Sequence, residues 1–268
     1  MRSGSHPLTV EPPPGASPFD LTGRTALVTG STRGIGFALA GALGRAGAQV
    51  VIHGRDSGTA EAGALSLRED GITTGSIAFD LRDEHAIKHG IARAQTEYGG
   101  IDVLVNNAGV IQRGPLTEFE PSVWREMFEI NVTAAMLVAN AVVPSMIRAG
   151  RGKIINVCSL LSELARPGVA AYASTKAALK MLTQSMCVEW AEHGIQSNGI
   201  GPGYIKTELT ERLASDPDFD SWVRGRTPAG RWGLPADLEG SVVFLASRAS
   251  DFVNGQVLYV DGGLLAAI

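Results

Sequence analysis

Residues 25–36 read TALVTGSTRGIG, and this stretch decides which fold we expect. A short apolar run leads into a glycine-rich turn, and a helix follows directly. Gly30 permits the tight turn, Gly34 lets the backbone approach a phosphate, and Gly36 lets the helix pack closely on the strand. The N-terminal amides of that helix then point at the phosphate. We therefore expect a dinucleotide-binding turn, with a purely structural tight turn as the alternative. Its predicted contacts are Gly30, Ser31, Arg33, Gly34, Ile35 and Gly36.

Outside this unit, short apolar runs alternate with amphipathic helical stretches. Seven runs predict strands, at residues 25–29, 50–53, 75–79, 103–105, 153–157, 197–200 and 257–260. Helical stretches between them include residues 35–46, 86–97, 122–148 and 173–192. Such alternation is typical of βαβ units, and right-handed crossovers place helices on both faces of the sheet. We predict an α/β protein with one Rossmann-type, doubly wound domain and a seven-stranded, mostly parallel sheet.

Length and composition point to an ordinary enzyme-like domain. The chain has 268 residues, which favours one domain, and its net charge of -4 offers no basic patch for nucleic acid or membrane. No apolar run approaches the roughly 20 residues that span a bilayer. Two cysteines, Cys158 and Cys187, favour a reducing cytoplasm over a disulfide scaffold. Residues 1–19 predict a disordered tail without a secretory signal, and residues 20–268 the domain.

The end of the second predicted strand, VVIHGRD, bears on which dinucleotide binds. An acidic residue there would bind the ribose 2′-hydroxyl of NAD, whereas arginine accommodates the 2′-phosphate of NADP. Gly54 occupies the expected acidic position, Arg55 follows it, and Arg33 lies in the glycine turn. Two guanidinium groups form a suitable phosphate clamp. We predict NADP, with NAD as the alternative if Asp56 takes the acidic role in a shifted register.

Two further strand ends are expected to contact the dinucleotide. Asp80 and Leu81 follow the third strand in FDLRD, where the carboxylate can accept a bond from the adenine amino group or simply form a turn. Asn107, Ala108 and Gly109 follow the fourth strand in NNAG. A bare glycine lets the backbone lie along the ribose. The asparagines are also expected to tie neighbouring strand ends together.

The second half of the chain carries acid–base residues. Tyr172 and Lys176 in YASTK lie one helical turn apart, so their side chains share a face. An ammonium beside a phenol lowers the tyrosine pKa, which suits proton exchange near neutral pH. Ser159 ends the fifth strand and can bond the same substrate oxygen, and Asn131 is expected to hold a water. Alone, a Tyr-x-x-x-Lys pair is usually an ordinary helix pair, but the serine and glycine turn favour function.

These motifs together resemble the short-chain dehydrogenase/reductase family. The resemblance covers about residues 19–268, with TGSTRGIG, NNAG, the helical asparagine, the serine, YASTK, PGY at 202–204 and the terminal VDGG in family order. It implies an NAD(P)-dependent oxidoreductase that transfers a hydride between a nicotinamide and the carbon of an alcohol or ketone. It also implies a homotetramer.

The resemblance assigns a role to each catalytic residue. It implies that Tyr172 is the acid–base, that Ser159 polarises the carbonyl, and that Asn131 anchors a proton-relay water. It implies that Lys176 holds the nicotinamide ribose and lowers the tyrosine pKa. Further cofactor contacts are implied at Pro202, Gly203, Ile205 and Thr207.

A closer resemblance, to dehydrogenases of small polyol acids within this family, bears on the substrate. It is carried by GVIQRGPLTEF, VCSLLSELAR, KMLTQSMCVEWA, GPGYIKTELT, RTPAGRWG and ASDFVNGQVLYVDGG. It implies gluconate or 5-keto-gluconate as the substrate. A buried carboxylate needs a cation, because an unpaired buried charge is costly. Arg113 is the first choice, with Arg166 and Lys206 as alternatives.

Other residues are expected to complete the substrate site. Ser162 and Glu163 are predicted to hold substrate hydroxyls, and Tyr204 is predicted to contact the substrate beside Ser159 and Tyr172. The segment 208–231, rich in charge, proline and glycine, predicts a mobile lid. No metal site is expected, because the histidines stand alone.

Two alternatives to the polyol-acid function remain open. One is another enzyme of the family, a 3-oxoacyl carrier-protein reductase or a different sugar or polyol dehydrogenase. The other is a non-catalytic nucleotide-sensing protein on the same fold. That second class is expected to have lost Tyr172, Lys176 or Ser159, and this chain keeps all three.

Overall fold

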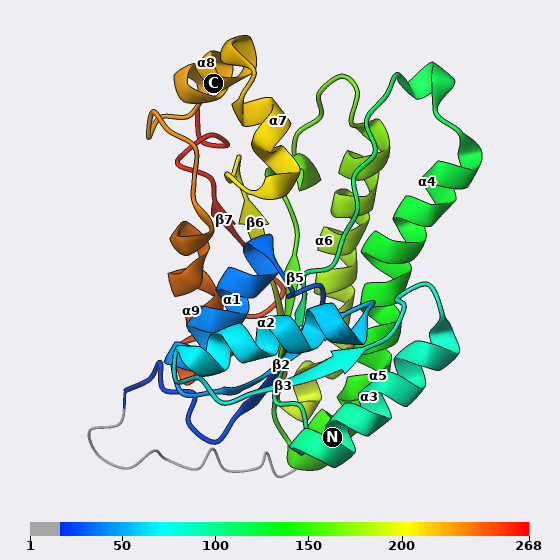
Figure 1. The fold of residues 1–268 in the computed structure, drawn as a ribbon, viewed down its shortest axis with the longest axis vertical. Helices are drawn as coiled ribbons and strands as arrows, with labels where there is room; N and C mark the ends of the chain where they lie inside the picture. Colours follow the sequence, from blue (N-terminus) through cyan, green and yellow to red (C-terminus); the bar gives the residue numbers. More distant parts are fainter. Residues whose placement is uncertain (1–16, 268) are drawn as a thin grey trace, which may run out of the picture.

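A seven-stranded sheet forms the centre of the molecule, as the computed structural model of residues 17–267 describes it (Figure 1). The strand order is β3-β2-β1-β4-β5-β6-β7, and every described pairing is parallel. This confirms the predicted doubly wound sheet. The strands are β1 (Thr25–Val28), β2 (Gln49–Gly54), β3 (Thr74–Ala78), β4 (Val103–Asn106), β5 (Gly152–Val157), β6 (Ile195–Pro202) and β7 (Val257–Val260).

Helices cover both faces of the sheet. One apolar core lies under α1, α2 and α9, and a second lies under α3, α5 and α6. Strands covered on both sides need apolar residues at every position, which explains the continuous apolar runs in the sequence. The helices are α1 (Gly34–Arg45), α2 (Ser57–Glu69), α3 (Glu84–Tyr98), α4 (Pro121–Phe128), α5 (Ala134–Ala149), α6 (Ala170–Trp190), α7 (Glu211–Ala214), α8 (Pro217–Arg226) and α9 (Glu239–Ala246).

The strand order reverses between β1 and β4, which lie side by side at the centre of the sheet. The chain leaves β1 toward β2 and β3, and leaves β4 toward β5, β6 and β7. Ligands of open α/β sheets bind outside the carboxyl ends of the strands at such a switch point. The glycine turn after β1 and the NNAG segment after β4 therefore flank the expected cofactor site.

The helix predicted at 122–148 is interrupted by one wide turn. A π-helix, Glu129–Thr133, separates α4 from α5 and carries Asn131, which is 1% exposed. Single π turns inside α-helices are frequent at functional sites. By length and composition alone, the combined helix Pro121–Ala149 is apolar enough to cross a membrane. No apolar stretch long enough for this was predicted from the sequence. In the fold, α5 places Val138, Val142 and Met146 in the core instead.

Both ends of the domain differ in detail from the predictions. The predicted tail reached residue 19, and residues 1–16 of it lie outside the described part. Residues 17–20 form a turn in which Pro18 O accepts a hydrogen bond from Ala249 N at 3.2 Å. The predicted lid is regular, since it contains a 3-10 turn, α7 and α8. Figure 1 shows these helices beside the C-terminus, where Arg226 Nη2 donates to Ala267 O at 3.0 Å.

Candidate active site

The glycine turn after β1 has the geometry that its sequence predicts. Gly30 has a φ of 61°, and a Cβ there would lie 2.9 Å from Ala108 Cα. A Cβ on Gly36 would lie 2.3 Å from Asn107 Nδ2 and 2.5 Å from Gly30 O, so only glycine fits there. Gly34 has a φ of 59°, and its Cβ position meets no described atom within 4 Å. The turn is thus tight, closely packed against β4, and open where a phosphate would approach.

The N-terminus of α1 is available to an anion. Arg33 occupies the N-cap position in extended backbone, and its side chain makes no capping hydrogen bond within residues 17–267. Unsatisfied amides at a helix N-terminus carry a partial positive charge and bind phosphate. The 12-residue α1 and the open face of Gly34 therefore fit the diphosphate of a dinucleotide.

The end of β2 lacks a free carboxylate for a ribose. Gly54 ends the strand, and Asp56 caps α2 by accepting a hydrogen bond from Thr59 N at 2.8 Å. Asp56 is therefore engaged, which disfavours the shifted register. Arg55 is exposed beside it, and Arg33 pairs with Glu208 at 3.1 Å through side chains that are 78% and 69% exposed. Exposed ion pairs of this kind are weak, so Arg33 is free to turn toward a phosphate.

Polar side chains join the strand ends, as the sequence predicts. Asn107 Nδ2 donates to Thr29 O and Gly30 O, both at 3.0 Å, which links β4 to β1. Asn106 Nδ2 donates to Asn156 Oδ1 at 2.9 Å, which links β4 to β5. Thr29 and Asn156 were not predicted as partners from the sequence. Their position at strand ends next to the switch point was the available signal.

The third strand end is more strongly self-paired than expected. Asp80 accepts three hydrogen bonds from the Arg82 side chain and one from its backbone, at 2.6–3.2 Å. These bonds lower the pKa of Asp80 to about 2, with a further contribution from the Arg55 charge. The Leu81 side chain is buried, so it would reach a cofactor only through its backbone. The adenine contact of Asp80 stays a prediction.

The acid–base residues meet at the carboxyl end of β5. Tyr172 and Lys176 lie on α6, Ser159 follows β5, and the Lys176 Nζ lies 5.7 Å from the centre of the Tyr172 ring. Lys176 Nζ donates to Val157 O at 2.6 Å. A Cβ on Gly109 would lie 3.7 Å from the same Nζ, so the NNAG segment borders this group. The structure thus brings together the three predicted segments that carry Ser159, the Tyr172–Lys176 pair and Gly109.

The predicted lowering of the tyrosine pKa is wrong for the protein alone. Burial raises the pKa of Tyr172 to about 12, and the Ser159 hydrogen bond and the Arg113 charge only partly oppose this rise. Burial lowers the pKa of Lys176 to about 8, because a desolvated ammonium is disfavoured. Lys176 is directed at Val157 O rather than at the phenol. Tyr172 is therefore a protonated donor at neutral pH.

The Asn131 side chain forms a clamp between two segments, and its contact with a water stays a prediction, since Oδ1 can accept a second hydrogen bond. Its Oδ1 accepts from Val110 N at 2.7 Å, and its Nδ2 donates to Val110 O at 2.9 Å and Thr175 Oγ1 at 3.0 Å. Both amide hydrogens are consumed, so the side chain has no donor left for a water. It joins the loop after β4 to α6.

Two predicted hydroxyl-binding residues are occupied by the protein itself. Ser162 Oγ donates to Lys176 O at 2.9 Å and accepts from Ser159 N at 3.3 Å, and its side chain is buried. This corrects the prediction for Ser162. Glu163 Oε1 accepts from Tyr259 Oη at 2.6 Å and also from Lys180 Nζ, and both bonds lower the pKa of Glu163. One of its carboxylate oxygens thus remains for a substrate, and that contact stays a prediction.

The predicted cations Arg113 and Arg166 lie together near the phenol. Desolvation and the Arg166 charge lower the pKa of Arg113, while nearby Tyr172 and Tyr204 oppose this effect. Burial raises the pKa of Tyr204, and the charges of Arg166 and Arg113 only partly oppose this rise. Lys206 is exposed, and its charge acts on Asp220 in α8.

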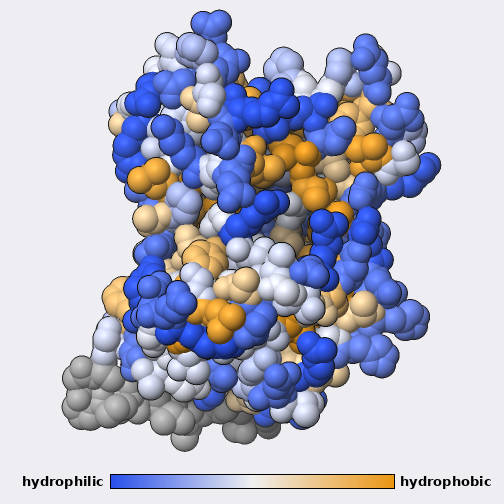
Figure 2. Space-filling view, in the orientation of Figure 1, coloured by the Kyte–Doolittle hydropathy of each residue, from blue (hydrophilic) through white to orange (hydrophobic). Residues whose placement is uncertain are grey.

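An aromatic cluster covers this cationic group, and the sequence analysis did not find it. The Tyr204 ring lies edge-on to Phe219 at 5.5 Å, to Trp222 at 5.7 Å and to Trp232 at 5.7 Å between centroids. Trp232 is 3% exposed and donates to Asp220 Oδ1 at 2.9 Å. The spacing of these rings in the expected lid was the available signal. Figure 2 shows the molecule hollowed between the α7–α8 side and the α4 side, with hydrophobic residues on the walls.

Comparison with known proteins agrees with this geometry. Residues 30–265 match a family model described as Enoyl-(Acyl carrier protein) reductase. The chain belongs to the short-chain dehydrogenase/reductase family. It is 48% identical to the gluconate 5-dehydrogenase of Gluconobacter oxydans (strain 621H) over 250 residues, 93% of this chain and 98% of that protein. It is 46% identical to the 2-dehydro-3-deoxy-D-gluconate 5-dehydrogenase of Formosa agariphila over 252 residues, 93% and 96% of the two chains.

A solved relative has a similar structure. The crystal structure of a gluconate 5-dehydrogenase from Burkholderia cenocepacia J2315, in complex with NADP and tartrate, superposes with a TM-score of 0.91. The two chains are 49% identical, and the match covers 93% of this chain and 98% of that one. The resemblance to the short-chain dehydrogenase/reductase family is thereby confirmed, as is the closer resemblance to its polyol-acid branch.

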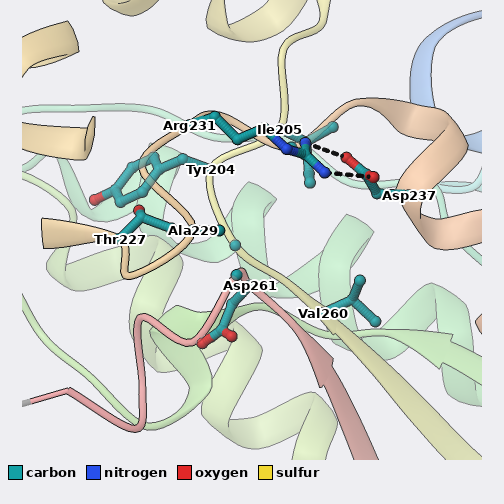
Figure 3. A pocket seen from close by; sticks show the side chains of 11 residues that line it. Tyr204, Ile205, Thr227, Ala229, Arg231, Asp237, Val260 and Asp261 are labelled. Carbon is teal, nitrogen blue, oxygen red and sulfur yellow. Dashed lines mark hydrogen bonds and ion pairs between the residues drawn. The ribbon is translucent and has the colours of Figure 1, made fainter. Parts of the chain in front are cut away.

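A cavity of this short-chain dehydrogenase/reductase lies beside the β6 and β7 ends, on the backbone of the PGY segment (Figure 3). Its volume is about 230 Å³. Its charged side chains are already satisfied: Arg231 pairs with Asp237 through two bonds of 2.7 and 2.9 Å, and Asp261 accepts from two backbone amides. Because the Arg231, Asp237 and Asp261 side chains of this cavity already have partners, we place the reaction at Tyr172 instead.

A buried histidine supports the glycine turn of this family member. His53 is 1% exposed, accepts a hydrogen bond from Gly30 N on Nδ1 at 3.1 Å, and contacts Phe79 O through Nε2 at 3.2 Å. The two contacts together require the neutral ring with hydrogen on Nε2. Burial lowers the pKa of His53 to about 4, although Phe79 O and the Asp80 charge oppose this effect.

We expect His53 to make the fold acid-sensitive. The unfolded ring takes a proton below about pH 6.5, whereas the folded ring does so only near pH 4. Stability is therefore complete above pH 6.5 and is lost as the pH falls from 6.5 toward 4, by about 3 kcal/mol. Chemical denaturation across this range should show a flatter pH dependence for His53→Asn than for wild type. His193→Asn, at a histidine whose side chain is 37% exposed, serves as the control. The same pH dependence of the unfolding free energy in all three proteins would contradict the role of His53.

Proposed function

We propose that this chain is an NADP-dependent oxidoreductase that acts on a small polyol acid, gluconate or its 5-keto form. The observation that carries the proposal is the meeting of Tyr172 and Ser159 with the guanidinium groups of Arg113 and Arg166. A proton donor for a ketone oxygen thus lies beside cations for a carboxylate. The activities for which the relatives are named, gluconate 5-dehydrogenase among them, support the same substrate class.

Tyr172, Ser159 and Lys176 each have a separate role in the proposed reaction. The Tyr172 hydroxyl gives its proton to the ketone oxygen during reduction and takes it back during oxidation, while the Ser159 hydroxyl holds that oxygen. The bound nicotinamide supplies or accepts the hydride. Lys176, near Gly109 and the phenol, holds the ribose side of the cofactor. A raised tyrosine pKa keeps the donor protonated at neutral pH, which favours reduction.

NADP is the proposed cofactor, held by the residues predicted from the sequence. The glycine turn and the α1 N-terminus receive the diphosphate, and Arg33 and Arg55 receive the 2′-phosphate. The engaged Asp56 supports this choice, since no other carboxylate within residues 17–267 ends β2. Pro202, Gly203, Ile205 and Thr207 line the nicotinamide end at β6. Relatives solved with NADP agree with the choice.

Arg55→Asp should shift the preference from NADPH toward NADH. The variant removes a phosphate partner and places a carboxylate beside the position of the 2′-phosphate, so NADPH binding should weaken about 10–100-fold. Steady-state kcat/KM for both cofactors measures the shift. Arg93→Asp makes the same charge change on exposed α3 and should leave the preference unchanged. An unaltered preference in Arg55→Asp would exclude the phosphate clamp.

NADPH oxidation with 5-keto-gluconate tests the substrate class directly. The wild-type protein should turn over this keto acid with NADPH faster than with NADH, because its site holds two cations for the carboxylate. An acetoacetyl thioester, the substrate type of a 3-oxoacyl carrier-protein reductase, should be turned over poorly. Clear turnover of the thioester without turnover of the keto acid would replace the proposed function by that alternative. Equal rates with several sugars would favour a different sugar dehydrogenase.

We further propose a cytoplasmic homotetramer. On α6, Met181 and Val188 are 61% and 82% exposed, which is unusual for large apolar side chains and supports contact with another copy. Light scattering after size exclusion measures the mass. A monomer of 28.1 kDa at micromolar concentration would contradict this assembly.

A further inference from the structure

Arg166 lies in the loop between β5 and α6, where three observations describe it. Its guanidinium carbon lies 5.1 Å from the centre of the Phe219 ring on α8. Its Nε is buried and has no hydrogen-bond partner within residues 17–267. Its charge acts on Arg113 and on Tyr204. The side chain therefore contacts α8 through Phe219, and its charge acts on Arg113 and Tyr204.

Two neighbouring guanidinium groups without an acidic partner form an anion site. Neither Arg113 nor Arg166 takes part in an ion pair among the described residues. Other arginines do pair with a carboxylate, among them Arg24, Arg33, Arg45, Arg224 and Arg231. Like charges repel, and the desolvation that lowers the Arg113 pKa adds to this cost. A carboxylate between the two groups would relieve the repulsion and satisfy the Nε. Paired arginines also bind carboxylates with planar, charge-assisted geometry.

The contact with Phe219 extends this site to the lid. Phe219 belongs to the cluster with Tyr204, Trp222 and Trp232, so the position of its ring fixes that of α8. A guanidinium over an aromatic face is stabilised by the ring quadrupole. When an anion holds Arg166 in place, the ring is held as well. Binding of an acid and placement of α8 are therefore linked through one side chain.

We propose that Arg166 is a specificity-determining residue, which binds the substrate carboxylate together with Arg113 and holds α8 over the substrate through Phe219. This inference rests on the proposed function, because it assigns the cation that selects acids over neutral polyols at the same site. It assigns a role to a residue that the sequence offers only as an alternative to Arg113.

The test compares gluconate with its uncharged amide, gluconamide, in wild type and in Arg166→Gln. Binding to the NADP-saturated protein is followed by the fluorescence of the tryptophans beside Phe219, and kcat and KM are measured in parallel. Arg166→Gln should weaken gluconate binding about 10–100-fold, since charge-assisted hydrogen bonds are lost. Gluconamide and NADP affinities should stay within about twofold, as neither ligand carries the carboxylate that this cation contacts.

Three further variants sharpen the test. Arg166→Lys keeps the charge without the planar fork, so it should recover gluconate binding in part. Phe219→Leu should weaken gluconate about 2–5-fold through the lost cation–π contact, and it should reduce the fluorescence change. Arg212→Gln, an exposed change on α7, should match wild type.

The outcomes separate this inference from the proposed function. If Arg166→Gln leaves gluconate affinity unchanged, or weakens gluconate, gluconamide and NADP alike, the carboxylate role is overturned. If wild type neither binds nor turns over gluconate, the proposed function fails, and tartrate becomes the probe. Tartrate binding that is weaker in Arg166→Gln than in wild type and in Arg212→Gln would then support an acid site at Arg166. Equal tartrate affinity in all three proteins would overturn it.

Discussion

Tyr172→Phe should lose about 10²–10⁴-fold in kcat, because the variant removes the hydroxyl that exchanges a proton with the substrate oxygen. Phenylalanine keeps the ring that packs near Lys176, so folding and cofactor affinity should be preserved. Single-turnover reduction of 5-keto-gluconate with saturating NADPH isolates the chemical step from binding. The expected result is a loss in kcat with little change in cofactor affinity.

A second tyrosine provides the control for this prediction. Tyr98 lies at the end of α3, and its Oη donates to Ser76 O in β3 at 3.1 Å. Strand β3 is at the edge of the sheet, three strands from β4 and four from β5, beside which Tyr172 lies. Tyr98→Phe should lower the unfolding free energy by about 1 kcal/mol and leave kcat intact. If Tyr172→Phe retained wild-type turnover while Tyr98→Phe behaved as expected, the proton would have another donor and the proposed chemistry would be wrong.

Gly36→Ala should disrupt both cofactor binding and the fold. The added Cβ would lie 2.5 Å from Gly30 O, a backbone atom that cannot turn away, and 2.3 Å from Asn107 Nδ2. Displacing α1 from β1 should lower the unfolding free energy by about 1–3 kcal/mol. Each 1.4 kcal/mol of misfit at the turn weakens NADP binding about tenfold. Isothermal titration with NADP and thermal unfolding measure the two effects.

Gly240→Ala separates the steric effect from helix propensity. Gly240 lies in α9, and a Cβ there meets no described atom within 4 Å. Alanine favours helix over glycine by about 1 kcal/mol, so this control should bind NADP normally and unfold no more easily. Normal NADP affinity in Gly36→Ala would show that α1 shifts freely, against the close packing described above.

The sequence predicted the features that depend on local pattern. The stretch at 25–36 specifies strand, turn and helix, and the apolar runs specify a sheet buried on both faces. The spacing of Tyr172 and Lys176 places both on one face of α6, where they are found. These features need only residue type and period, which a single sequence displays.

Features that depend on tertiary surroundings were missed. The pKa of Tyr172 depends on burial as well as on its neighbour four residues away, and burial dominates. The two amide hydrogens of Asn131 are taken by Val110 O and Thr175 Oγ1, which are distant in sequence. The aromatic cluster needs α8 folded back over β6. A single sequence does not show which distant residues meet in the fold. The hydrogen-bond partners and pKa values of these side chains could therefore not be predicted from it.

The Asn131 clamp joins the loop after β4 to α6, and this connection bears on the relative position of Arg113 and Tyr172. Val110 lies three residues before Arg113, and Thr175 Oγ1, which Asn131 contacts, donates in turn to Tyr172 O at 2.7 Å. The loop that carries Arg113 and the helix that carries Tyr172 are therefore joined through one side chain. A displacement of either segment would strain the hydrogen bonds of Asn131, so we expect the proposed carboxylate site and the proposed proton donor to keep a fixed relative position.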